Sequence, residues 1–185
     1  AGLVHLSGLS KLNRLHLGSP SGIWSHQDDR INADEVTKIN GRGLSHLSGL
    51  DRLERLCLSD SLVDDEGLSC LPELNALEEL YLSRTLVTDA GMVHLAKHKN
   101  LGVLHLVGTR VTDNGLAKLK QCENLRLLWM YDTRVTKTGI DDLTKALPTC
   151  VVRTNTEAAI REDMASERNK AAQATGNGVG EKTKS

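Results

Sequence analysis

The chain has 185 residues, a formal net charge of −1 and no phenylalanine, and aromatic residues make up 2% of it. A charge this close to zero, without a basic stripe, argues against nucleic-acid binding. No apolar run reaches the roughly 18 residues of a membrane span, so we expect no membrane contact by this segment.

The first 17 residues carry two leucine patterns. Leucines three apart predict half of a short helix, and a following L-x-x-L-x-L stretch predicts a strand. These leucines are Leu3, Leu6, Leu9, Leu12, Leu15 and Leu17. Because the chain opens inside a helical half-unit, we expect a fragment of a longer protein, unless the insertion that follows folds over this end.

An insertion separates this first strand from the next. Leu12 lies 41 residues before Leu53, whereas later units are 24 residues apart, and residues 18–42 hold the excess. We expect a long turn and then a helix capped by Asn32 and interrupted by glycines. Trp24 is expected to cover the N-terminal end of the stack, and a role as a binding anchor is the alternative.

From Leu53 onward the sequence repeats every 24 residues. Each unit begins with L-x-x-L-x-L, whose alternation predicts a strand with one buried face. A short polar turn follows, and then leucines three apart predict a short helix. The first leucines of the four units are Leu53, Leu77, Leu101 and Leu125. One such unit cannot close a core alone, so the units must stack on one another.

Three polar or glycine columns recur with the same period. The hydroxyls of the first column are expected to form hydrogen bonds with the backbone of the turns. The residues of the second are expected to cap the helices, and the glycines of the third are expected to permit close helix packing. In that order they are Ser61, Thr85, Thr109 and Thr133; Asp64, Thr88, Thr112 and Thr136; and Gly67, Gly91, Gly115 and Gly139. Asp65, Asp89 and Asp113 follow the caps, at the positive ends of the helices.

The repeats are expected to end near residue 152. Leu147-Pro148 stops the last helix, and residues 149–154 align with the strand positions of the unit before, which predicts a final strand. Residues 153–185 have too few apolar side chains to dock firmly, so we expect a partly helical or disordered tail. The predicted organisation is a repeat domain over residues 1–152, with its insertion at 18–42, followed by this tail.

The L-x-x-L-x-L stretches at 53–58, 77–82 and 101–106 resemble the leucine-rich repeat family. Thr or Ser stands where most of that family has Asn, and V-T-D-x-G-L begins the helices. Both features resemble the ribonuclease-inhibitor-like branch, the cysteine-containing repeats of F-box receptors and the 24-residue bacterial arrays. The resemblance implies an α/β, right-handed solenoid with a curved parallel sheet inside and short helices outside.

Candidate metal sites are weak. His94 and His98 stand four apart but lack the Glu of a zinc-peptidase helix, and His46, Cys70 and His94 share a column without any further ligand signature. We expect ordinary helix residues, with no metal and no cofactor. The four cysteines form no C-x-x-C pair, so free thiols are expected, which weakly favours the cytoplasm.

Catalysis is not expected on the concave face either. Strand alternation places His16, Cys57, Tyr81, His105 and Trp129 in one row, but Tyr81 separates the thiol of Cys57 from His105. Strands about 4.8 Å apart then leave that thiol and imidazole roughly 10 Å apart, whereas activation of a nucleophile needs about 3 Å. We therefore predict that the chain is not an enzyme.

The sequence favours a non-enzymatic scaffold that binds a protein partner on its concave sheet and adjoining turns. The predicted binding residues are Arg55, Tyr81, Arg84, Val103, His105, Val107, Leu127, Trp129, Tyr131 and Asp132. Their apolar members are expected to form one hot spot, with Arg84 and Asp132 as its polar rim. The partner's identity is open, and the chain itself is expected to be a monomer. Two other functions are a structural spacer within a larger protein and a substrate-recognition segment of a ubiquitin-ligase-like receptor. For the patch itself, the alternative is that the tail covers it through Ile160 and Met164.

Overall fold

The computed structural model describes residues 2–18 and 38–155. The chain divides into a unit Ala1–Thr154 and a unit Asn155–Ser185, and the elements described below belong to the first unit. The expectations for Trp24, for a helix capped by Asn32 and for the tail fall outside the described residues.

One six-stranded parallel sheet runs through the unit in the order β1-β2-β3-β4-β5-β6. The strands are β1 (Arg14–His16), β2 (Arg55–Cys57), β3 (Glu79–Tyr81), β4 (Val103–His105), β5 (Leu127–Trp129) and β6 (Val151–Arg153). Each strand pairs with the next in the register of the repeat, and Arg14 lies against Arg55 in spite of the insertion between them. The predicted first and last strands are confirmed by β1 and β6.

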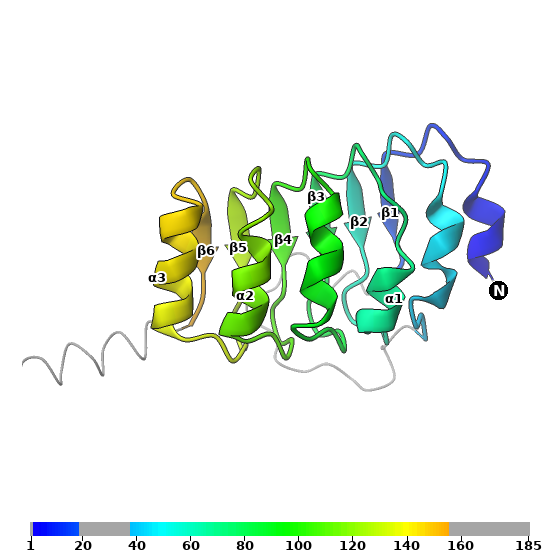
Figure 1. The fold of residues 1–185 in the computed structure, drawn as a ribbon. Coiled ribbons are helices and arrows are strands. Elements are labelled where there is room, and N and C mark those ends of the chain that lie inside the picture. The colour runs from blue at the N-terminus through cyan, green and yellow to red at the C-terminus, as the bar shows by residue number, and fades with distance from the viewer. Residues whose placement is uncertain (1, 19–37, 156–185) are drawn as a thin grey trace, which may run out of the picture. The chain divides into compact units, whose positions relative to one another are not determined.

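A layer of short helices covers one face of the sheet (Figure 1). The helices are η1 (Gly2–Leu6), η4 (Arg42–Leu47), α1 (Asp65–Ser69), η5 (Gly91–Lys97), α2 (Asp113–Leu119) and α3 (Lys137–Ala146). Helices η1, η4 and η5 have 3-10 geometry. That geometry suits a pattern such as Met92 and Leu95, because side chains three apart superimpose in a helix with three residues per turn.

The core lies between the sheet and the helices and is almost entirely aliphatic. The middle residues of β2 to β5, which are Leu56, Leu80, Leu104 and Leu128, have no exposed surface. Each fully buried leucine stabilises the fold by about 1.5–3 kcal/mol relative to an exposed one. Repeated layers of leucine therefore supply the buried apolar surface that stabilises this fold without phenylalanine.

A ladder of aspartates links successive repeats. The carboxylate of Asp89 accepts hydrogen bonds from the backbone N–H of Thr112 at 2.7 Å and from its hydroxyl at 2.6 Å. Asp65 and Asp113 bind Thr88 and Thr136 in the same way. Three of the four predicted caps are present, since the side-chain oxygens of Asp64, Thr112 and Thr136 accept hydrogen bonds from N–H groups of the first helical turns. The prediction for Thr88 is wrong, because η5 begins after Ala90 and has no side-chain cap. The bonds from these aspartates to the next repeat were not predicted from the sequence.

Three members of the glycine column make room for these carboxylates, whereas Gly67 lies against the backbone of Gly41 and Asn40. A Cβ at Gly115 would lie 2.5 Å from Oδ1 of Asp89, and one at Gly139 would lie 2.2 Å from Oδ1 of Asp113. Gly91 stands in the same relation to Asp65. The predicted role of these glycines in close packing is thus confirmed, and its reason is the aspartate of the preceding unit.

The turns after the strands are held by the predicted hydroxyl column. The hydroxyls donate to the backbone carbonyl three residues earlier, at distances from 2.5 to 2.9 Å. Just before each hydroxyl stands a residue with positive φ, namely Asp60 (57°), Arg84 (54°), Gly108 (67°) and Asp132 (54°). This left-handed conformation suits glycine best. At Asp60, Arg84 and Asp132 the contacts of the turn therefore outweigh the usual backbone preference.

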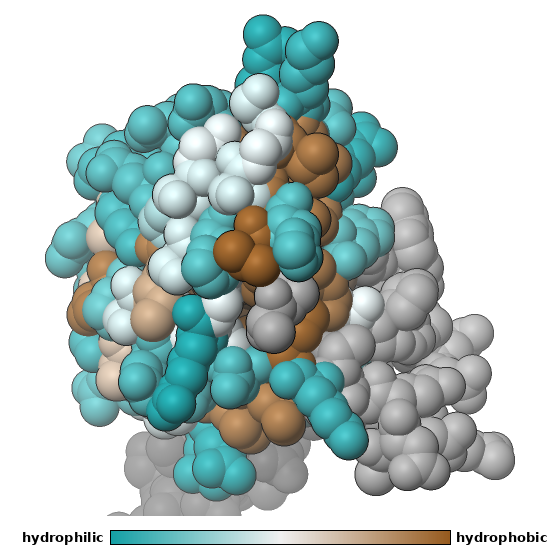
Figure 2. All heavy atoms as spheres, turned by 90° about the vertical axis from the view of Figure 1, so that its right-hand side faces the viewer, coloured by the Kyte–Doolittle hydropathy of each residue, from teal (hydrophilic) through white to brown (hydrophobic). Residues whose placement is uncertain are grey.

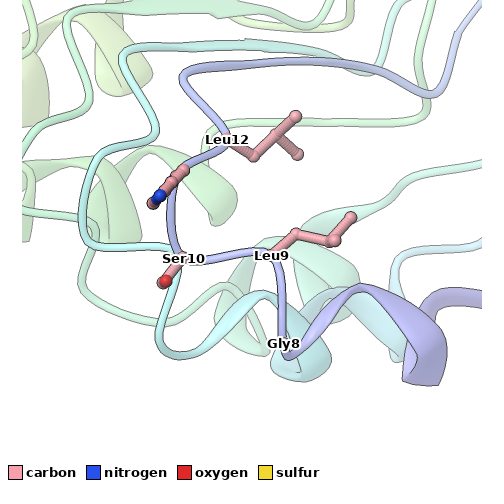
Figure 3. A pocket seen from close by; sticks show the side chains of 5 residues that line it. Gly8, Leu9, Ser10 and Leu12 are labelled. Atoms are coloured by element: carbon pink, nitrogen blue, oxygen red, sulfur yellow. The ribbon is translucent and has the colours of Figure 1, made fainter.

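Apolar side chains gather at the N-terminal end of the unit (Figure 2). Leu9 is 47% exposed, and Leu3 and Leu6 are partly buried against the core. A pocket of about 450 Å³ is lined by residues 8–12 at this end, where Leu9 and Leu12 point to the same side (Figure 3).

None of the helices within residues 2–18 and 38–155 is long and apolar enough to span a bilayer.

Candidate protein-binding surface

The face of the sheet opposite the helices, which we call the open sheet face, carries two side-chain rows fixed by strand register. One row joins Arg55, Glu79, Val103, Leu127 and Val151. The other row consists of His16, Cys57, Tyr81, His105, Trp129 and Arg153. The predicted juxtaposition from His16 to Trp129 is confirmed, and β6 extends both rows by one residue.

Four rings form a continuous aromatic strip along this face. The ring centroids of Tyr81 and His105 are 4.4 Å apart, and those of His105 and Trp129 are 5.4 Å apart with an interplanar angle of 19°. Tyr131 follows Trp129 at 5.9 Å. Rings at such distances attract one another beyond the area they bury, so these contacts hold the four rings in place along the sheet.

Beside the strip lies an apolar patch that spans β4, β5 and β6. Its members are Val103, Val107, Leu127, Trp129, Tyr131 and Val151. The first five are half-buried, and Val151 is 49% exposed. Register places Leu127 between Val103 and Val151, so the patch reaches the last strand, which was not among the binding residues predicted from the sequence.

Tyr81 lies in the row that strand alternation predicts, but its side chain is largely covered. It is 7% exposed, and its hydroxyl donates to Oε2 of Glu79 at 2.5 Å. Glu79 in turn holds the guanidinium of Arg55 by two hydrogen bonds of 2.7 and 2.5 Å. The hydrogen bonds from Arg55 lower the pKa of Glu79, and burial raises the pKa of Tyr81. These residues form a closed network on the N-terminal half of the face.

Arg84 is likewise engaged within the protein. Its guanidinium donates to both carboxylate oxygens of Asp60, at 2.6 and 2.8 Å, and Asp60 is 2% exposed. A buried carboxylate bound in this bidentate manner holds its partner firmly. The place of Arg84 beside the patch is thus fixed by its pairing with Asp60, and Asp132 is exposed on the turn after β5.

The surroundings of Cys57 disfavour a reactive thiolate. Burial raises the pKa of its thiol, which lowers the fraction of reactive thiolate. Tyr81 stands between Cys57 and His105 in the row, as the sequence predicts. Within residues 2–18 and 38–155, no group of three or more His, Cys, Asp or Glu side chains is placed to hold a metal ion.

His98 lies in the core, where it was not expected from the sequence. It is 1% exposed, and its Nδ1 accepts the backbone N–H of Leu74 at 3.4 Å. Its Nε2 is buried without a hydrogen-bond partner in the described part of the chain. Burial, together with the neighbouring Lys97 charge, lowers the pKa of His98 to about 4. The ring is therefore neutral at physiological pH.

Thiol reactivity provides a test of this packing. The four cysteines are free; Cys57, Cys122 and Cys150 are buried, and Cys70 is partly exposed. Burial raises the pKa of Cys122 and of Cys150 to about 11. We expect Cys70 to react first with an aromatic disulfide reagent at neutral pH, and the buried thiols to react only on unfolding. Fast reaction of all the thiols in the native protein would contradict the packing.

Comparison with known proteins places this geometry in a fold class. No protein-family model and no curated protein matches the chain. Among solved structures, an internalin C2 from Listeria monocytogenes is 19% identical, with a TM-score of 0.52 over 80% of this chain and 62% of that one. The leiomodin-1 actin-binding site 2 is 12% identical, with a TM-score of 0.53 over 91% of this chain and 95% of that one. A leucine-rich-repeat protein from Leptospira interrogans is 16% identical, with a TM-score of 0.43 over 80% and 38%.

The six-stranded parallel sheet and its helical layer, together with the likeness to internalin C2, define an α/β leucine-rich-repeat solenoid. The fold class predicted from the 24-residue period is thus confirmed. The chain spans about three fifths of the internalin C2 chain that it resembles.

Proposed function

We propose that the chain is a non-enzymatic scaffold that binds a protein partner through the apolar patch on β4 to β6. The observation that carries the proposal is the aromatic strip running into this patch on a rigid sheet. Binding energy at protein interfaces concentrates in a few aromatic and aliphatic anchors held in place before binding. Leiomodin-1, which shares the fold, contains a segment named as an actin-binding site, which supports the use of this fold for protein recognition.

The sheet alone is too small for a complete interface. Six strands about 4.8 Å apart and three residues deep present roughly 300 Å², whereas a standard interface buries about 800 Å² on each partner. The partner must therefore also contact the turns at the edge of the sheet. Leu62 and Leu86 occupy equivalent turn positions there and are 40% and 47% exposed.

Replacing Trp129 by Ala tests the proposal. A protein partner is first isolated by its binding to the whole chain. For that partner, Trp129→Ala should weaken binding by about 2 kcal/mol, which is roughly a thirtyfold rise in Kd, because central aromatic anchors contribute this much to interfaces. The melting temperature should change little, because Trp129 is half-buried on the face opposite the core. Titration calorimetry and thermal unfolding measure the two effects.

Val93→Ala is the matched control, since Val93 is 48% exposed on η5 in the helical layer. It should leave the affinity unchanged. An affinity that survives both Trp129→Ala and Tyr131→Ala would refute the site. A chain that binds no protein through any face would instead favour the structural spacer.

A further inference from the structure

We propose that the apolar patch accepts a protein segment that carries carboxylates beside an apolar or aromatic side chain. This inference rests on the proposed function and adds the chemistry of the partner. It follows from the charges that surround the patch, which differ from those on the N-terminal half of the same face.

Two arginines flank the patch directly. The guanidinium of Arg126 lies over Gly102, the residue before β4, where a Cβ on that glycine would be 3.1 Å from Nη2. Arg153 stands next to Trp129 in strand register. Both side chains are exposed, and neither forms an ion pair or a side-chain hydrogen bond with another residue of 2–18 or 38–155. Their donors are therefore available to a ligand.

The N-terminal half of the face has no such surplus. There the guanidinium of Arg55 is bound to Glu79, and that of Arg84 is bound to Asp60, so both charges are neutralised within the protein. Around β4 to β6, residues 102–110, 126–134 and 150–155 contain one acidic residue, Asp132, and four basic ones. The basic residues are Arg110, Arg126, Arg134 and Arg153.

Charge complementarity then points to carboxylates on the partner. A guanidinium presents a planar fork of donors that matches a carboxylate and is weakly hydrated, so it forms strong pairs at interfaces. Phosphates of a nucleic acid could also pair with arginine. However, the chain's net charge is −1, and Val103, Leu127 and Val151 suit aliphatic or aromatic side chains better than stacked bases.

Selection from a random peptide-display library tests the inference with the whole 185-residue chain as bait. Parallel baits are wild type, Trp129→Ala and Arg126→Ala/Arg153→Ala. The charge-matched control is Arg42→Ala/Arg52→Ala, which removes two exposed arginines far from the patch in sequence. Enriched peptides are then synthesised with their acidic residues intact, or with Asp→Asn and Glu→Gln.

Wild type should enrich peptides that combine acidic and apolar residues, and Trp129→Ala should not enrich them. The amide versions should bind wild type roughly tenfold more weakly, and that difference should vanish in Arg126→Ala/Arg153→Ala but persist in the control. Raising the salt concentration should weaken wild type more than the double variant, because the charges are exposed.

The remaining outcomes separate the two proposals. Neutral or basic peptides enriched in a Trp129-dependent way would refute the partner chemistry and leave the proposed function standing. No Trp129-dependent enrichment at all would count against both. Tighter Trp129-dependent binding of a labelled oligothymidine or oligouridine would assign the surface to nucleic acid instead. A large gain in acidic-peptide affinity for the full chain carrying Ile160→Ser/Met164→Ser would make the chain's own tail the occupant and overturn the proposal.

Discussion

The folded protein should lose stability as the pH falls from about 6.5 to 4, and His98 should account for about 3 kcal/mol of that loss. In the unfolded chain His98 titrates near its ordinary pKa of 6.5, whereas in the folded protein its pKa is about 4. Between these values the unfolded chain binds more protons, so stability is fully present above pH 6.5 and falls as the pH drops toward 4. Burial is the main cause, since the ring is 1% exposed and charging it would leave a cation in the aliphatic core.

His98→Gln isolates this contribution from that of the carboxylates, which titrate in the same range. Glutamine keeps an acceptor for the N–H of Leu74 but does not titrate. Urea unfolding of both proteins at several pH values gives the free energy of unfolding, and the difference between them should change by about 3 kcal/mol across this window. Parallel pH profiles for the two proteins would show that the pKa of His98 is the same in the folded and the unfolded chain, which would contradict the lowered pKa.

Gly115→Ala should destabilise the solenoid by about 3 kcal/mol, although alanine is the better helix former. The added Cβ would lie 2.5 Å from Oδ1 of Asp89 and 2.8 Å from Cγ1 of Val111. The Asp89 carboxylate cannot move aside without breaking its two hydrogen bonds to Thr112, each worth roughly 1.5–3 kcal/mol to a charged acceptor. These costs exceed the helix-propensity gain of about 1 kcal/mol.

Gly8→Ala is the matched control, because a Cβ there would meet no atom within 4 Å. A double-mutant cycle with Asp89→Ala then tests the mechanism. If the carboxylate is what Gly115 accommodates, the alanine should cost at least about 1 kcal/mol less when Asp89 is absent. Additive effects of the two substitutions would place the clash elsewhere, at Val111 or Met92.

Much of the architecture follows from the period of the sequence. Once Leu53, Leu77, Leu101 and Leu125 are aligned, strand register and the side-chain rows follow, because a parallel stack keeps equivalent positions side by side. The same alignment also contains a signal for the burial of His98, which was not predicted. His98 falls in the column of Leu50, Leu74 and Cys122, which are core residues.

Other features depend on side-chain packing that the period does not specify. Register alone places Arg55 beside Glu79, but the burial of Tyr81 follows only when its hydroxyl reaches that carboxylate and its ring packs on His105. In the pair of Arg84 and Asp60, both residues have left-handed backbone conformations, which the period does not specify either. The binding residues predicted on the N-terminal half of the face are therefore less accessible than alternation suggested, whereas those on β4 and β5 lie together.

Hydroxyl-radical footprinting of the chain with and without its bound partner tests the central proposal most directly. The rings of Trp129 and Tyr131 should become severalfold less reactive in the complex, because central interface anchors lose their contact with water. Labelling at Val93 in the helical layer should stay unchanged. Undiminished labelling of both rings, with protection instead at Val93 or on the helices, would contradict binding through the apolar patch.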